Sequence, residues 1–447
     1  MPAHSKKIIF FIVFVASIVL QNASMTYAQS IGPVKVVGRN LLVDFDGNGF
    51  YDPYVISGVG YSPYPIGAFP TQFGMCTTDP IGNFTCPGTT VYDDPAVLDR
   101  DFSILQNMKT NTIRTWGQVT PILLNKARDY NLKIVAGFWV DYSLDITSLT
   151  VRDSIKNDFI NYVNLYKNYP AILIWAIGNE NNLYIPTANL NQWYSLVNEM
   201  AQLAHAAEGA TYHPVAVING DILEIGNATY ASRDVDLPSV DIWGTNVYRG
   251  SSFGSLFTDY ASQSSKPLYI SEFGIDAYDN NTGSLQTALQ ASWAAGLWDE
   301  LVRSSDPYSR KGVTPVAIGG TLMEYSDEYW KAGGQWSVTA LTQENGGVSL
   351  PGSSPDNFIN EEWWGMMSIQ DDGINLDIVT PREVYTTLSS RFNCVSLGRY
   401  HYAGAENNKL CPKGGTLSAC CSNPNAKAYQ SGCVNACPYP LPPLRQR

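Results

Sequence analysis

The sequence predicts an α/β fold in which eight strand and helix units close into a (β/α)8 barrel. The first observation is that short β-rich runs alternate with helix-compatible stretches between about residues 54 and 321, as in a parallel sheet with crossover helices. The second is that eight such runs fit the length of one barrel, which is more economical than two doubly wound domains. We therefore predict a TIM barrel with a small N-terminal hairpin and a Cys-rich C-terminal extension.

The first 28 residues are expected to be a secretory signal peptide. Lys6 and Lys7 precede the apolar run 8–20, and a polar stretch then ends at the small residue Ala28. An apolar run of this length is shorter than the roughly 20 residues that span a bilayer. We expect no integral membrane span, and we predict a protein that is secreted, extracellular or held in a cell wall.

Residues 29–393 are expected to form the barrel domain. A hairpin over 34–53, with its turn at 47–49, should cover the floor of the barrel, and a last helix is expected near 380–392. The eight β-rich runs are 54–61, 112–117, 133–140, 171–178, 214–219, 240–246, 267–274 and 316–323. The clearest helical spacing lies between them, at 97–110, 154–168, 190–208 and 285–303.

The eight cysteines indicate an oxidising compartment and a disulfide-linked C-terminal extension over 394–447. Cys76 and Cys86 lie in one early loop and are expected to pair, whereas the sequence does not choose among the pairings of the six in the extension. Those six are Cys394, Cys411, Cys420, Cys421, Cys433 and Cys437. Asn83, Asn227 and Asn280 each begin an acceptor triplet for N-glycosylation, so a glycoprotein is expected in a eukaryotic host.

Composition excludes some classes of partner. A formal net charge of −12 argues against binding nucleic acid, which requires a basic surface. An aromatic content of 12% suits a cleft that holds sugar rings, although an aromatic-rich core would give the same number. We expect a monomer that binds a polysaccharide or oligosaccharide and uses no cofactor and no metal, because no histidine pair with metal-ligand spacing lies at a strand end.

Polar residues at the ends of the predicted strands are the candidate site, because active sites of such barrels lie at the C-terminal ends of the strands. They are Arg114, Trp116, Trp139, Asp141, Asn179, Glu180, Asn246, Tyr248 and Glu272. Glu180 and Glu272 follow strands four and seven and can face one another across the barrel mouth. Two such carboxyl groups suit cleavage of a glycosidic bond, one as the acid and the other as the nucleophile or base.

Two motifs carry a family resemblance: WAIGNENN (175–182) and YISEFG (269–274). Together, at strands four and seven, they resemble the paired motifs of glycoside hydrolase clan A, the retaining β-glycosidases on (β/α)8 barrels that include cellulases, β-mannanases and β-glucanosyltransferases. The resemblance covers roughly 33–393. It implies that Glu180 is the acid/base and Glu272 the nucleophile.

Further roles follow from the same resemblance. It implies that Arg114 and Tyr248 hold the nucleophile and that Asn179 contacts the sugar 2-hydroxyl. Charge and hydrogen bonding from Arg114 and Tyr248 would favour the ionised nucleophile, while apolar walls and the neighbouring negative charge would keep Glu180 protonated. Each of the three supporting residues also has a purely structural interpretation.

The eighth strand departs from the commonest clan pattern. In the segment 319–331, Glu324 and Tyr325 stand where many relatives place a single tryptophan platform. Glu324, Asp327 and Glu328 are interpreted either as ligands of sugar hydroxyls or as loop anchors. The candidate stacking platforms, about half of which we expect to be core residues, are Trp116, Trp139, Trp243, Tyr325, Trp330 and Trp363.

The predicted function is a secreted retaining glycoside hydrolase that cleaves β-linked polysaccharide of the β-glucan or β-mannan type. Retention requires the carboxyl groups of Glu180 and Glu272 to lie about 5 Å apart. Two alternatives stay open. One is a β-1,3-glucanosyltransferase that remodels wall glucan, since water and a sugar can both open the glycosyl-enzyme. The other is a noncatalytic carbohydrate-binding wall protein on a barrel that has lost its activity.

Overall fold

The computed structural model describes residues 34–45, 49–68, 77–78, 84–85, 91–306, 314–334, 341–344, 346–373 and 376–403. The predicted signal peptide, the pairing of Cys76 with Cys86 and the extension beyond residue 403 lie outside the described residues and stay predictions.

Eight parallel strands close into a barrel, which confirms the predicted (β/α)8 fold. Each predicted run coincides with one barrel strand, although the fifth strand ends one residue beyond its run, and the last strand pairs with the first, Gly319 opposite Ile56. In chain order the strands are β4 (Ile56–Gly60), β7 (Thr112–Arg114), β8 (Lys133–Phe138), β9 (Ile172–Ile177), β10 (Val215–Gly220), β11 (Ile242–Asn246), β12 (Leu268–Phe273) and β15 (Ala317–Leu322). Runs such as ILIWAI in β9 are continuously apolar because both faces of a barrel strand are buried.

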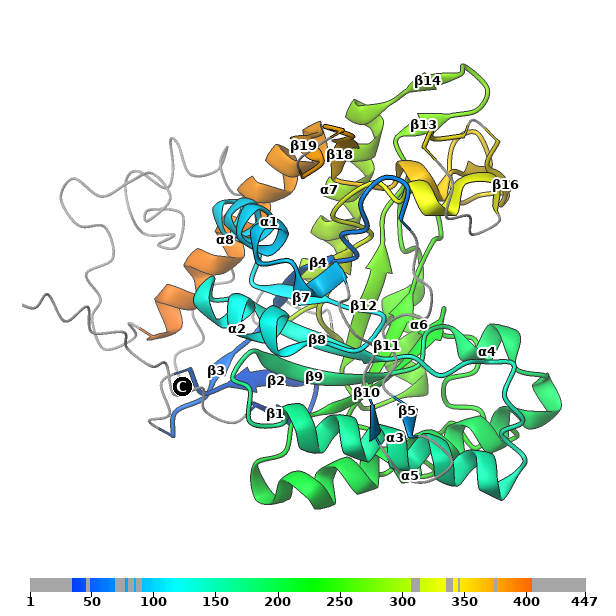
Figure 1. Ribbon diagram of the computed structural model, residues 1–447. Helices are drawn as coiled ribbons and strands as arrows, with labels where there is room; N and C mark the ends of the chain where they lie inside the picture. The colour runs from blue at the N-terminus through cyan, green and yellow to red at the C-terminus, as the bar shows by residue number, and fades with distance from the viewer. Residues whose placement is uncertain are drawn as a thin grey trace, which may run out of the picture.

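Helices surround the barrel, with α1, α7 and α8 on one side of the strands and α3 and α5 on the opposite side (Figure 1). Their bounds are α1 (Pro95–Met108), α2 (Pro121–Asp129), α3 (Leu149–Tyr166), α4 (Asn181–Tyr184), α5 (Leu190–Glu208), α6 (Leu256–Gln263), α7 (Thr287–Arg303) and α8 (Glu383–Ala403). The sequence fixes where α1 and α2 begin. Asp94 and Thr120 accept hydrogen bonds from the first-turn amides, and each is followed by a proline at the first helical position.

The last described helix, α8, covers the outside of the barrel against α7. The rings of Phe392 and Trp298 lie 4.7 Å apart, and Arg391 Nε contacts Asp299 Oδ1 at 2.9 Å. The helix begins close to where the sequence predicted it but continues to Ala403, so the predicted domain boundary at 393 falls inside it.

A three-stranded antiparallel sheet covers the floor of the barrel. Its strands are β1 (Val34–Val37), β2 (Asn40–Val43) and β3 (Asp52–Pro53). Leu41 and Val43 belong to the same apolar cluster as Ile174 inside the barrel. Gly38, whose φ of +60° favours glycine, lies in the turn of the β1–β2 hairpin, and β2 pairs with β3 in a second hairpin. The turn predicted at 47–49 falls between those two strands in the sequence, and it stays a prediction because 46–48 lie outside the described residues.

Short antiparallel pairs of strands lie in the loops. They are β5 (Thr77–Thr78) with β6 (Phe84–Thr85), β13 (Tyr278–Asp279) with β14 (Ser284–Leu285), β16 (Val348–Ser349) with β17 (Phe358–Ile359), and β18 (Met367–Gln370) with β19 (Ile378–Pro381). The 3-10 turns are η1 (Val91–Asp93), η2 (Thr187–Asn189), η3 (Gly209–Thr211), η4 (Tyr329–Gly334) and η5 (Glu361–Trp363).

A buried ion pair ties the loop after β15 to the start of α8. Arg382 Nη1 and Nη2 donate to Asp327 Oδ1 and Oδ2 at 2.6 and 2.7 Å, and both side chains are buried. Gln343 Nε2 and the Gly365 amide donate to the same carboxylate at 3.0 Å. Of the two interpretations of Asp327, the structure shows the loop anchor.

We expect Arg382→Met to lower the free energy of unfolding by about 3–5 kcal/mol, because it leaves the Asp327 carboxylate buried without its cation. Denaturant unfolding followed by fluorescence and circular dichroism measures the change. The matched control is Arg128→Met, whose partner Asp129 is exposed and whose loss should cost under about 1 kcal/mol. Equal losses in the two variants would contradict a structural role for the buried pair.

Candidate active site

The site lies where β7, β9, β11 and β12 end, the edge at which the sequence placed it. Arg114 ends β7, Asn246 ends β11, and Glu272 is the penultimate residue of β12. Asn179 and Glu180 follow β9 directly, before α4. Parallel strands in a closed barrel bring these ends together although the residues are far apart in the chain.

Glu272 accepts hydrogen bonds from three side chains. Arg114 Nη1 and Trp116 Nε1 donate to its Oε1 at 2.6 and 2.7 Å, and Tyr248 OH donates to its Oε2 at 2.8 Å. Tyr248 is in turn held edge-on by the ring of Trp364, with centroids 4.9 Å apart. The Glu272 carboxylate is therefore buried, fixed in orientation and supplied with donors on both oxygens, as an ionised group requires.

Glu180 has a contrasting environment. Its Oε1 accepts one described hydrogen bond, from Asn246 Nδ2 at 3.0 Å. Burial, and secondly the negative charge of Glu272, raise the pKa of Glu180 to about 7, against smaller opposing effects of Asn246 and Arg114. The two carboxyl groups thus differ in the way that an acid and a nucleophile must differ.

A polar network joins the two carboxyl groups. Asn179 Oδ1 accepts from Arg114 Nη2 at 2.7 Å and from Asn246 Nδ2 at 3.1 Å. Ser271 Oγ donates to Asn246 Oδ1 at 2.7 Å and so orients that amide. One guanidinium therefore contacts Glu272 and Asn179, and one amide contacts Asn179 and Glu180.

Two asparagines after Glu180, to which the sequence alone assigned no role, hold its backbone in place. Glu180 has a φ of +55°, in the left-handed region. Asn181 Oδ1 accepts from the Asn179 amide at 2.9 Å, and Asn181 Nδ2 donates to the Val140 carbonyl at 2.8 Å. Asn182 exchanges hydrogen bonds with the backbone of Gly220 on β10. The run NENN was the available signal, because short amides stabilise tight turns.

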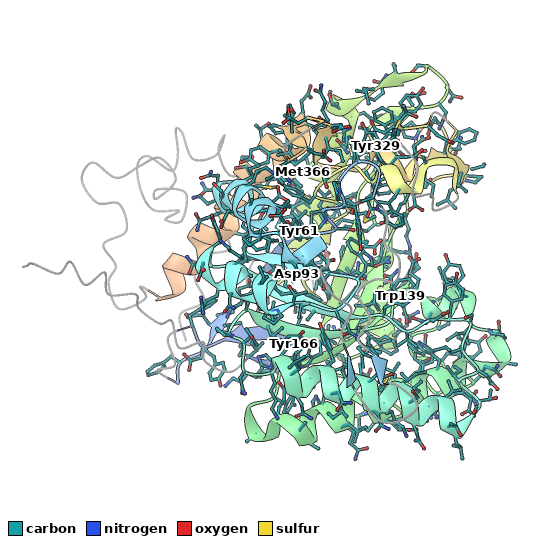
Figure 2. The ribbon with its side chains drawn as sticks, in the orientation of Figure 1. Tyr61, Asp93, Trp139, Tyr166, Tyr329 and Met366 are labelled. Carbon is teal, nitrogen blue, oxygen red and sulfur yellow. The ribbon has the colours of Figure 1, made fainter. Side chains whose placement is uncertain are left out.

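The predicted aromatic platforms divide into half-buried and buried side chains, and one of them contacts the site. Trp116, Trp139 and Trp363 are half-buried, and Figure 2 shows Trp139 on the side of the barrel that carries α4. Trp243 and Trp330 are buried. Trp116 reaches the site as a hydrogen-bond donor to Glu272, with its ring beside the Arg114 guanidinium at 4.8 Å.

The expectation that Tyr325 binds substrate is corrected by its surroundings. Tyr325 is fully buried, and its hydroxyl donates to Asp101 Oδ1 at 2.7 Å. Tyr61 donates to Asp101 Oδ2 at 2.9 Å and packs edge-on against the Tyr325 ring. These contacts leave neither face of Tyr325 open to a sugar, because the ring is enclosed by α1 and by the barrel.

The other two carboxyl groups after β15 lie together. Glu324 is fully buried, and burial, followed by the neighbouring Glu328, raises its pKa well above the ordinary value. Lys331 Nζ contacts Glu328 Oε2 at 2.6 Å and Glu361 Oε2 at 2.7 Å. Lys331 is therefore shared between two carboxylates, while burial beside Glu328 favours the neutral form of Glu324.

Within the described ranges, no group of three or more His, Cys, Asp or Glu side chains is arranged to hold a metal ion. In the same ranges no helix has both the length and the apolar character needed to cross a bilayer.

Comparisons with known proteins show a similarity of fold. No protein-family model and no curated protein sequence matches the chain. The β-glucuronidase of Bifidobacterium dentium, complexed with coumarin-3-O-glucuronide, is 17% identical with a TM-score of 0.52, over 80% of this chain and 49% of its own. The β-glucuronidase of Ruminococcus gnavus, complexed with C6-substituted uronic isofagomine, is 15% identical with a TM-score of 0.52, over 80% and 52%. This chain spans about half the length of those enzymes.

Proposed function

We propose that the protein is a retaining β-glycoside hydrolase in which Glu272 is the nucleophile and Glu180 the acid/base. The observation that carries the proposal is the contrast between the two carboxyl groups at one end of the barrel. Glu272 is surrounded by three donors, whereas Glu180 has a pKa raised to about 7. The fold neighbours support the proposal, because both are β-glucuronidases.

The first step forms a glycosyl-enzyme. The Glu272 carboxylate attacks the anomeric carbon, and protonated Glu180 gives its proton to the glycosidic oxygen as the bond to the leaving group breaks. Arg114, Trp116 and Tyr248 hold the attacking carboxylate in one orientation, so little reorganisation is needed at the moment of attack.

The second step hydrolyses the glycosyl-enzyme. Water attacks the anomeric carbon, Glu180 takes the proton from the water, and the ester bond to Glu272 breaks, so that two inversions give net retention. Forming the ester removes the negative charge of Glu272, which is the second-largest cause of the raised pKa of Glu180. The pKa of Glu180 therefore falls when the residue has to act as a base.

The charges around the site favour a neutral β-glycan of the β-glucan or β-mannan type over a uronide. Arg114 is already paired with Glu272, and Lys331 is shared between Glu328 and Glu361. A uronate would have to compete with these carboxylates for Arg114 and Lys331. The predicted signal peptide supports an exported enzyme that meets such glycans outside the cell.

The test is product analysis with β-glucans, β-mannans, xylans and aryl β-glucuronides, resolved by oligosaccharide length. We expect shorter products from a neutral β-glycan, with the anomeric configuration retained when the reaction is followed by NMR. Predominantly longer products would instead make the protein a transglycosylase. Binding without turnover of any glycoside would contradict the proposal and favour a noncatalytic carbohydrate-binding wall protein.

A further inference from the structure

We propose that Tyr142 and Tyr184 form a sugar-stacking platform on the leaving-group side of the site, which binds the glycan residue beyond the scissile bond. The inference deepens the proposed function and rests on it for the direction of the cleaved bond. The platform consists of these two residues. They come from two loops, Tyr142 from the one after β8 and Tyr184 from the end of α4, after β9.

The two rings form an exposed stacked pair. Their centroids lie 4.7 Å apart with an interplanar angle of 24°. Tyr142 is 44% exposed and Tyr184 56%, so each side chain keeps about half of its surface open. Tyrosines commonly stand with an apolar ring face available and a polar hydroxyl at its edge, which matches the alternating CH and OH groups of a sugar.

Both loops are fixed by hydrogen bonds, so the platform exists before any ligand binds. Asp141 Oδ1 accepts from the Ser143 amide at 2.8 Å and closes a tight turn around Tyr142. The single turn of α4 is closed by the Ile185 amide, which donates to the Asn181 carbonyl at 2.9 Å, and the Asn181 side chain donates to the carbonyl of Val140, two residues after β8. A preformed platform loses little conformational entropy on binding.

The position of Tyr184 relative to Glu180 indicates on which side of the scissile glycosidic bond the platform lies. Glu180 precedes α4 directly, and Tyr184 lies four residues later, one helical turn away. Burial is the largest cause of the raised pKa of Tyr184, and the charge of Glu180 is the second, ahead of the smaller effects of Tyr142 and Glu272. The acid protonates the leaving-group oxygen, so side chains next to the acid face the leaving group.

The same platform would hold an acceptor during the second step. The acceptor hydroxyl oxygen attacks the anomeric carbon of the glycosyl-enzyme, Glu180 takes the hydroxyl proton, and the bond from the anomeric carbon to Glu272 breaks. The products are a longer glycan and a free Glu272 carboxylate. A sugar stacked on Tyr142 and Tyr184 thus competes with water, so the platform sets how much transfer accompanies hydrolysis.

The experiment compares Tyr142→Ala, Tyr184→Ala and both Phe variants with the wild type. The probes are the β-glycosyl fluoride and the tetrasaccharide of the sugar that the wild type cleaves fastest, because a fluoride leaving group is too small to reach the platform. We expect the ratio of kcat/KM for the tetrasaccharide to kcat/KM for the glycosyl fluoride to fall roughly 5- to 10-fold in each Ala variant. The Phe variants should keep the wild-type ratio because they keep the ring.

A second measurement uses the glycosyl fluoride as donor and a disaccharide of the same sugar as acceptor. The transfer-to-hydrolysis ratio should fall in the Ala variants, whereas Leu203→Ala, an exposed change on α5, should leave it unchanged. Ala variants that keep both ratios would overturn the platform. So would an equal loss of kcat/KM on both substrates, because an equal loss indicates a merely structural role.

Binding separates failure of the platform from failure of the proposed function. Calorimetric titration of the tetrasaccharide into the Glu180→Gln variant should show binding. Adding Tyr184→Ala to that variant should lower the affinity. If the wild type cleaves no glycoside but this loss of affinity is seen, the platform stands and the catalytic proposal fails. If the wild type cleaves glycosides but Tyr184→Ala leaves the affinity unchanged, the platform fails alone.

Discussion

Glu272→Gln is expected to lower kcat on an aryl β-glycoside by about 10⁴-fold or more, because an amide cannot form the glycosyl ester. The leaving group of an aryl glycoside needs little help from an acid, so the assay isolates attack by the nucleophile. Arg114, Trp116 and Tyr248 would then surround a neutral amide that accepts hydrogen bonds at only one atom. Initial rates of nitrophenol release measure the effect.

The matched control for this prediction is Glu199→Gln. Glu199 lies on α5 outside the barrel, where it pairs with Arg152 and Lys156, and its replacement should leave kcat unchanged. Circular dichroism and thermal unfolding of both variants establish that they are folded. Activity of Glu272→Gln within tenfold of the wild type would exclude Glu272 as the nucleophile.

Glu180→Gln is expected to reduce kcat on a natural glycan by about 10²–10⁴-fold, because the leaving sugar alkoxide is then not protonated. The loss of kcat/KM should be much smaller for a p-nitrophenyl glycoside, whose leaving group is stable as an anion. Parallel rates on the two substrates measure this contrast. Equal losses would assign Glu180 a structural role rather than proton transfer.

The same residue predicts the pH profile. The first step needs protonated Glu180, whose pKa is raised to about 7, so kcat/KM of the wild type should fall as the pH rises through about 7. With an aryl glycoside, Glu180→Gln should lack this decline because glutamine does not titrate. A decline that persists in the variant would show that another group is responsible for the basic limb.

The eight strands and the two carboxyl groups could be predicted from sequence because each has a local signal. A barrel strand is buried on both faces, so β9 appears as a continuous apolar run, and a polar residue such as Glu180 that interrupts it marks the strand end. The barrel connectivity then brings Glu180 and Glu272 to one edge. None of these steps requires knowledge of a side chain's surroundings.

The predictions that were wrong, and the features that the sequence did not predict, depend on contacts between distant segments. Trp116 and Tyr325 looked alike in sequence, but the indole of Trp116 reaches Glu272, whereas Tyr325 is buried against Asp101. The stacked pair of Tyr142 and Tyr184 forms between two loops and has no local pattern. Burial of a ring and the identity of its partner are set by tertiary packing, which propensity and spacing do not encode.

Closure of the barrel has a consequence for how the chain must fold. β4 is the first barrel strand and β15 the last, and they pair with each other, so the seam joins segments at opposite ends of the domain. Until β15 has been synthesised, β4 presents an open strand edge with nothing to pair along it. Such long-range pairing makes folding slow and exposes the nascent chain to edge-to-edge aggregation. The barrel is therefore completed late, and a chain that stops before Ala317 has two open edges instead of a smaller barrel.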